Sequence, residues 1–137
     1  MNDAKAVAAR FVAAMNQVFA KGNATALDDL VAAKYVDHTP SPTPSGGVSA
    51  PDLAGMKASF EAVHRVFPGA TVTVDELIVE GDRAALLVTF DGMMGPDSRT
   101  IGSIILRVED GKVAESWNFE AGGTARMQPK FATAPER

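Results

Sequence analysis

Residues 71–120 decide the fold of this chain, and they read TVTVDELIVEGDRAALLVTFDGMMGPDSRTIGSIILRVEDGKVAESWNFE. Four runs rich in apolar and β-branched residues are separated by Gly81-Asp82, by residues 92–97 and by Asp110-Gly111. Glycine and aspartate tolerate the positive φ angles that two-residue hairpin turns need. The pattern therefore predicts four strands joined by hairpins in an antiparallel meander.

The two middle strands of this meander carry apolar side chains on both faces. Alternate positions share a face, and the apolar sets are Ala84, Leu86, Val88 and Phe90 in one strand and Ile104, Leu106 and Val108 in the next. Helices should cover one face of the sheet. A second copy of the chain should partly cover the other face, so we expect a homodimer.

The chain before residue 70 has the periodicity of helices. Residues 3–21 form an amphipathic pattern that ends at Gly22, a typical residue after the last helical turn. Residues 25–35 predict a second, shorter helix, and a third begins around Pro51 and ends before Pro68. The expected fold is α+β, with three helices packed on the sheet.

Two segments lack regular patterns. Residues 39–51 contain four prolines and two adjacent glycines, so they form either a lid over a site or a tolerated insertion. The end of the chain has no clear period, and we expect a domain over residues 1–123 and an irregular tail over residues 124–137.

Composition excludes several classes of function. The net charge is −4 and no basic run occurs, which argues against nucleic acid and anionic membranes as partners. The chain has no cysteine and two histidines, so it can hold neither a thiolate metal site nor a histidine-rich one. Asp3, Lys5 and Arg10 interrupt the N-terminal alanines, which speaks against a signal peptide, and we expect a soluble, cytoplasmic protein.

Four side chains are candidates for binding or chemistry. Tyr35 and Trp117 combine apolar rings with polar tips, which suits either a pocket for a planar ligand or ordinary core packing. His38 is either an acid/base partner or a residue that anchors the following loop through a backbone carbonyl. His64 lies at the edge of the third helical stripe, where it either reaches the interior or stays at the surface.

The predicted order of elements resembles the cone-shaped nuclear-transport-factor-like fold. Within it, the chain is similar to the SnoaL-like polyketide cyclases over roughly residues 5–123. The matching segments are YVDHTP at 35–40, VFPG at 66–69, DELIVEGDR at 75–83 and LRVEDGKVAESW at 106–117.

This resemblance implies an apolar cavity and a general base. In such cyclases an acidic residue on the last strand, a few positions after a tryptophan, removes a proton next to a carbonyl without a metal or an organic cofactor. Glu120 stands nearest to that position, although the family's acid would align with Ala121. Glu120 is therefore either the general base or an exposed carboxylate at the strand end. Strict alternation places it on the face opposite Trp117.

These considerations predict a cofactor-free enzyme for a small apolar carbonyl compound, acting as an aldol cyclase or isomerase. Glu120 would be the base, and His38 or Asn118 would polarise the carbonyl. The alternative is a ligand-binding or accessory protein with the same cavity and no chemistry, and a hydrolase or dehydratase ranks last. The expected substrate-binding residues are Phe11, Met15, Tyr35, Met56, Phe60, His64, Phe90, Trp117 and Asn118.

Overall fold

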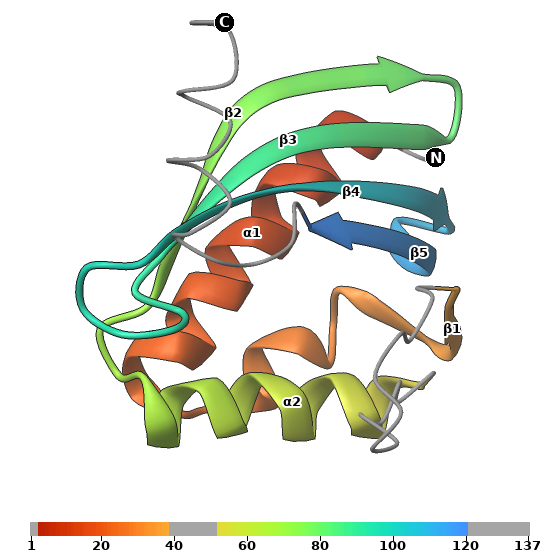
Figure 1. Cartoon of the computed structure of the whole chain (residues 1–137). Helices are drawn as coiled ribbons and strands as arrows, with labels where there is room; N and C mark the ends of the chain where they lie inside the picture. Colours follow the sequence, from red (N-terminus) through yellow and green to blue (C-terminus); the bar gives the residue numbers. More distant parts are fainter. Residues whose placement is uncertain (1–2, 39–51, 121–137) are drawn as a thin grey trace, which may run out of the picture.

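The computed structural model describes residues 3–38 and 52–120, and within them two α-helices lie against one five-stranded sheet (Figure 1). The predictions for the loop 39–51 and for the tail 124–137 lie outside the described residues. The elements are α1 (Ala4–Lys21), the 3₁₀ turn η1 (Ala24–Leu27), β1 (Val31–Asp37), α2 (Leu53–Val66), β2 (Thr71–Glu80), β3 (Arg83–Asp91), β4 (Arg99–Glu109) and β5 (Lys112–Glu120).

The predicted meander is confirmed. Strands β2 to β5 pair in sequence order as antiparallel neighbours, and the full strand order is β1-β5-β4-β3-β2. Gly81 has a φ of 60°, and Asp110 and Gly111 have φ angles of 54° and 76°. The β2–β3 and β4–β5 hairpins thus turn at the glycine-aspartate pairs because glycine and aspartate accept left-handed backbone conformations.

The prediction of a helix over residues 25–35 is wrong. Only Ala24–Leu27 is helical, as a 3₁₀ turn, and Val31–Asp37 is a strand that runs parallel to β5. Val31 and Tyr35 are both buried four residues apart, as they would be on a helix. Residues four apart also share a face of a strand, so this spacing does not distinguish a strand from a helix. A register shift between Val31 and Val36 makes the strand irregular. The sheet is therefore mixed, and there are two α-helices rather than three.

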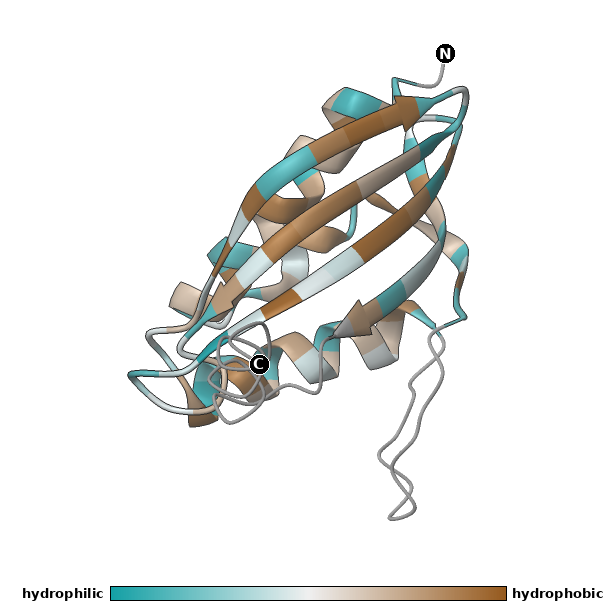
Figure 2. Cartoon of the chain, turned by 45° about the horizontal axis from the view of Figure 1, so that its top comes forward, coloured by the Kyte–Doolittle hydropathy of each residue, from teal (hydrophilic) through white to brown (hydrophobic). Residues whose placement is uncertain are grey.

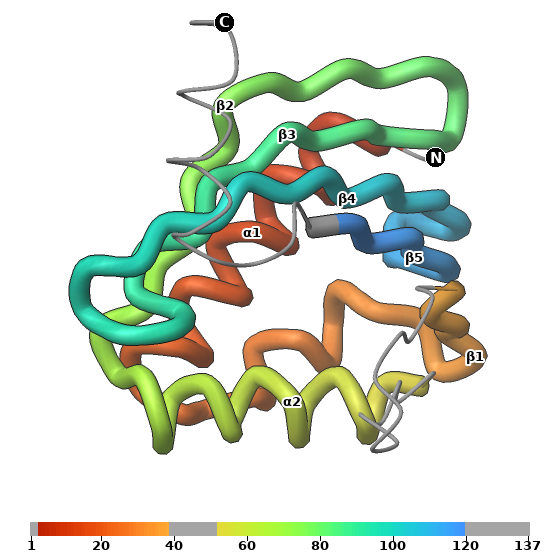
Figure 3. Tube along the Cα trace, viewed as in Figure 1, coloured from red at the N-terminus to blue at the C-terminus, as the bar shows by residue number. Residues whose placement is uncertain are grey.

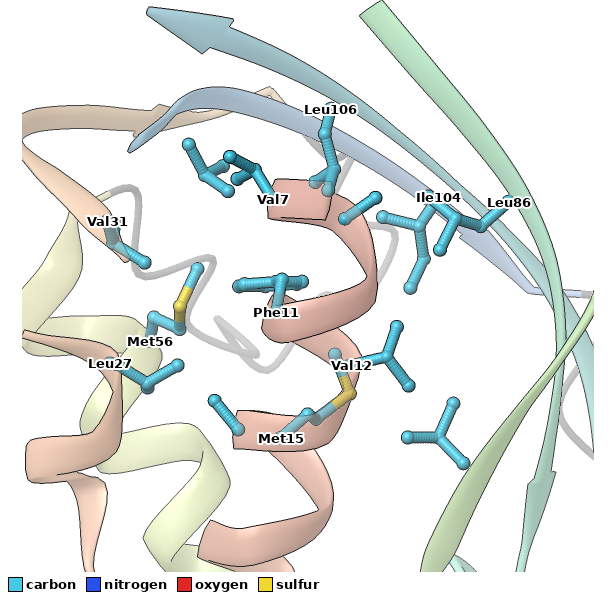
Figure 4. Close-up of a cluster of buried hydrophobic side chains, with 14 of the residues drawn as sticks. Val7, Phe11, Val12, Met15, Leu27, Val31, Met56, Leu86, Ile104 and Leu106 are labelled. Carbon is cyan, nitrogen blue, oxygen red and sulfur yellow. The ribbon is translucent and has the colours of Figure 1, made fainter. Parts of the chain in front are cut away.

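Both helices lie on the same side of the sheet (Figure 1). Asp3 caps α1 by accepting a hydrogen bond from the backbone N–H of Ala6, and Asp52 caps α2 in the same way for Gly55. Figure 4 shows Val7, Phe11 and Val12 of α1 between the sheet residues Leu86, Ile104 and Leu106 and the second group Leu27, Val31 and Met56. The core thus lies between the sheet and the two helices.

The other face of the sheet, which we call the outer face, carries exposed apolar side chains. The described residues contain no helix that covers it (Figure 2). Its exposed apolar side chains include Ile78 (65%), Leu87 (41%), Ile101 (44%) and Phe119 (47%). The pairing of this face with a second copy of the chain stays a prediction, which light scattering after size-exclusion chromatography tests.

None of the described helices is long and apolar enough to cross a membrane.

Candidate functional site

A buried pair of hydroxyl groups lies where β1 meets β5. Figure 3 shows β1 beside β5, although their residues are far apart in sequence. This pairing brings the Tyr35 hydroxyl to 2.5 Å from Ser116 Oγ, and either group can donate in the hydrogen bond. The exposed fractions are 3% for Tyr35 and 1% for Ser116. Both side chains belong to the helix-covered side of the sheet, where Ser116 pairs with the buried Leu106.

Two more polar side chains extend this pair. Asn118 Nδ2 lies 3.4 Å from Ser116 Oγ and 3.5 Å from Asp37 Oδ1, which are long, weak contacts. Asp37 and Asn118 are both partly buried. We call Tyr35, Asp37, Ser116 and Asn118 the β1–β5 polar cluster. The sequence pattern did not indicate Asp37 or Ser116 as site residues, because only the pairing of β1 with β5 brings them to Tyr35 and Asn118.

Burial controls the charge state of Tyr35. It raises the pKa of the Tyr35 phenol far above the ordinary value of 10.0. The hydrogen bond with Ser116 opposes this change, and the negative charge of Asp37 adds to it. The folded chain therefore keeps the phenol neutral, and able to donate a hydrogen bond, above the pH at which an exposed tyrosine ionises.

This raised pKa predicts how stability depends on alkaline pH. The unfolded chain loses its tyrosine proton near the ordinary pKa of 10.0, whereas the folded chain keeps it. The contribution of Tyr35 to the free energy of unfolding should thus be complete below pH 10 and fall as the pH rises further. Urea unfolding at pH 9, 10 and 11 should show a steeper loss for the native protein than for Tyr35→Phe. Tyrosinate absorbance at 295 nm that appears near pH 10 in the folded protein would contradict this.

Predicted apolar lining residues lie on the same side of the sheet as the polar cluster. Phe11, Met15, Met56 and Phe90 are buried there, and Phe60 packs against them partly exposed. The Phe60 ring lies edge-on to that of Phe19, with 5.5 Å between centroids, and 6.5 Å from the ring of Phe11. The structure therefore gathers the predicted aromatic residues of α1 and α2 into one group.

Glu120 is the last residue of β5, and its backbone pairs with Gly102 of β4. Its side chain lies outside the described part of the chain. Successive residues of a strand lie on opposite faces. Backbone position 120 therefore shares a face of β5 with positions 116 and 118, and Trp117 lies on the other face. The one register shift between β4 and β5 lies at Arg107/Val108, toward the other end of the strands. The role of Glu120 stays a prediction.

Trp117 and His38 lie together on the outer face. Their rings stack with 4.8 Å between centroids and an interplanar angle of 19°, and the Arg83 guanidinium lies 5.2 Å from the indole centroid. Trp117 pairs with Ile105 of β4 and lies two residues before the exposed Phe119, so both belong to the outer face. The predicted site residues other than His64 and Glu120 thus form two groups on opposite faces of the sheet.

Glu115 holds the His38 ring in place. His38 Nε2 lies 2.7 Å from Glu115 Oε1, and Arg107 Nε donates to the other carboxylate oxygen. The hydrogen bond from Arg107, and then that from His38, holds the pKa of Glu115 below its usual range. The backbone N–H of His38 also donates to the Ser116 carbonyl at 2.8 Å. These contacts attach the end of β1 to β5.

His64 connects the two helices. Its Nδ1 lies 2.8 Å from the Phe19 carbonyl oxygen in the last turn of α1, so this nitrogen is the donor. A carbonyl in that position has no partner within its own helix. Within residues 3–38 and 52–120, no cluster of three or more histidine, aspartate or glutamate side chains could hold a metal ion.

Comparisons with known proteins agree on one architecture. The family model described as SnoaL-like domain matches residues 9–116. IdmH from Streptomyces antibioticus is 20% identical, with a TM-score of 0.69 over 90% of this chain and 98% of that one. A SnoaL-like polyketide cyclase from Agrobacterium tumefaciens is 14% identical, with a TM-score of 0.71 over 94% and 99% of the two chains.

A NTF2-like protein from Anabaena variabilis is also similar, at 14% identity and a TM-score of 0.71 over 86% of this chain and 89% of that one. At these identities, the likeness shows a shared fold. A search of the curated proteins found no match.

Proposed function

The chain belongs to the SnoaL-like domain family and has the cone-shaped nuclear-transport-factor-like fold, and from this premise we propose that it is a cofactor-free cyclase or isomerase. Its substrate would be a small apolar carbonyl compound. The observation that carries the proposal is the β1–β5 polar cluster, which lies on the same side of the sheet as the aromatic side chains of α1 and α2. A mostly apolar interior with a few hydrogen-bonding groups suits a ligand with one or two oxygen atoms.

In this proposal Glu120 removes a proton from the carbon next to the carbonyl. The proposal is supported by backbone position 120, which alternates in step with Asn118 and Ser116, so that it needs no bulge. An apolar environment would raise the pKa of a carboxyl group and make its carboxylate a stronger base. The enolate would then close a ring by attacking a second carbonyl, or take the proton back at another carbon.

Asn118 is the better candidate for polarising the carbonyl. Its amide lies in the polar cluster, within two residues of position 120. The His38 ring instead contacts Glu115 and Trp117 on the outer face. An amide N–H that points to the developing oxyanion would stabilise the enolate.

Deuterium exchange tests this proposal. The native protein should incorporate deuterium from D₂O into ketones or β-keto esters, as NMR detects. Glu120→Gln should lower the exchange rate by about 10²-fold or more, the usual contribution of a general base. Glu76→Gln, on an exposed position of β2, is the matched control and should exchange at the native rate.

Two outcomes would contradict the proposal. Exchange that persists in Glu120→Gln would exclude Glu120 as the base. The absence of exchange with every compound, while the native protein still binds them, would favour the alternative of a ligand-binding protein without chemistry.

A further inference from the structure

The hydroxyl pair of Tyr35 and Ser116 lies buried among mostly apolar side chains. Ser116 and Thr100 are the buried polar residues among those described, and Ser116 is the more completely buried, at 1% exposure. A phenylalanine and an alanine of similar shape could fill the places of Tyr35 and Ser116 at little cost, because a buried hydrogen bond adds little net stability. Stability alone therefore does not explain the pair.

The pair has hydrogen-bonding capacity beyond its mutual bond. Two hydroxyl groups carry two protons, and the bond between Tyr35 and Ser116 uses one of them. If Ser116 donates to Tyr35, the phenol proton is available to another oxygen. Asn118 Nδ2 lies 3.4 Å from Ser116 Oγ and donates to it. Ser116 Oγ then accepts from Asn118, which leaves the proton of Ser116 to donate to the Tyr35 hydroxyl.

The charge around the pair selects the kind of oxygen. The negative charge of Asp37 acts on Tyr35, and Asn118 Nδ2 lies 3.5 Å from the Asp37 carboxylate. A ligand carboxylate or phosphate would be repelled by Asp37. A neutral phenol donor beside a carboxylate instead suits a neutral acceptor, which is a carbonyl or hydroxyl oxygen.

Position along β5 places this oxygen far from the proposed base. Ser116 and Glu120 are four residues apart on the strand, which is about 14 Å at roughly 3.4 Å per residue. A ligand that contacts both Tyr35 and the proposed base would therefore be longer than a single ring.

We propose that Tyr35 donates a hydrogen bond to a neutral oxygen at the end of the ligand remote from the reacting carbon, and that Ser116 positions the Tyr35 hydroxyl for this. Tyr35 is then a residue that determines specificity, selecting long ligands with oxygen at both ends. This inference rests on the proposed function, because the distance is counted from Glu120.

The chain supplies one reporter for each face of β5. Tyr35 is its only tyrosine and Trp117 its only tryptophan. Protein labelled with ¹³Cζ-tyrosine thus gives a single resonance from the polar cluster, whereas Trp117 fluorescence reports on the outer face. A ligand on the helix-covered side should shift the tyrosine resonance and leave the tryptophan emission unchanged.

A matched pair of ketones tests the inference. 2-Tetralone and 6-hydroxy-2-tetralone share the same reactive ketone, but only the second has an oxygen at the far ring. The native protein should bind 6-hydroxy-2-tetralone about tenfold more tightly, the effect of one hydrogen bond, and shift the Tyr35 resonance with it. Tyr35→Phe and Ser116→Ala should bind the two ketones with equal affinity, which separates loss of the preference from loss of all binding. Ser116→Thr keeps the hydroxyl and should retain the preference.

The outcomes separate this inference from the proposed function. Glu120-dependent exchange without preference for the hydroxylated ketone, and with an unmoved Tyr35 resonance, would overturn the inference alone. A preference that needs Tyr35, without exchange of either ketone, would support recognition of the remote oxygen and overturn the enzymatic proposal. A response of Trp117 in place of Tyr35 would overturn the inference, because the ligand would then lie on the outer face.

Discussion

Leu86→Ala should lower the free energy of unfolding by about 2–5 kcal/mol, the range for large-to-small substitutions in a core. Leu86 is 1% exposed and pairs with Leu77 on one side and Ile104 on the other. Figure 4 shows its side chain beside Ile104 in the layer that faces α1. The substitution would leave a cavity that these neighbours fill only in part. Urea denaturation monitored by circular dichroism measures the loss.

The next residue on the strand is the matched control. Leu87 has the same side chain but points to the outer face, where it is 41% exposed. Leu87→Ala in the monomer should cost less than about 1 kcal/mol, since half-exposed side chains contribute little burial. Equal losses for both variants at low protein concentration would contradict the assignment of the two faces. A loss for Leu87→Ala that grows with protein concentration would instead indicate the predicted dimer.

Gly22→Ala should lower the free energy of unfolding by about 2–4 kcal/mol. Two costs add up, the backbone strain at position 22 and a collision between the new Cβ and the His64 ring. Gly22 ends α1 with a φ of 76°, which a residue with a Cβ adopts at a cost. The Cβ of an alanine would also lie 2.6 Å from Cδ2 of His64. That ring has little freedom to move, because its Nδ1 bonds the Phe19 carbonyl. Thermal and urea unfolding would measure the effect.

Gly81→Ala separates the two causes. Gly81 has a φ of 60° in the β2–β3 hairpin, and no atom lies within 4 Å of its added Cβ. This variant should thus show the backbone strain alone, about 1–2 kcal/mol. The Gly22→Ala/His64→Ala double variant should be less destabilised than the sum of its single changes, because removing the ring removes the collision. Strict additivity, with equal losses at Gly22 and Gly81, would show that His64 yields freely.

Local signals in the sequence predicted much of the fold. The Gly81-Asp82 and Asp110-Gly111 turns located the hairpins because few residues accept positive φ. Apolar periodicity located α1 and α2. The same signal failed at β1, because burial at positions four residues apart, such as Val31 and Tyr35, fits a strand as well as a helix. Hydrogen bonds to β5, which is distant in sequence, decide that structure and leave no local trace.

The candidate site, like the fold, could be predicted from the sequence only in part. Strict alternation along β5 was enough to place Ser116, Asn118 and position 120 in step and Trp117 out of step, because successive residues of a strand point to opposite faces. The residue pattern was therefore sufficient to predict the meander, the two helices and these two sets of positions. The packing of α1 and α2 on the sheet was needed to show which set the helices cover. The tertiary structure also decided that Tyr35 meets Ser116 across 81 residues, because the parallel pairing of β1 with β5 depends on contacts between distant parts of the chain.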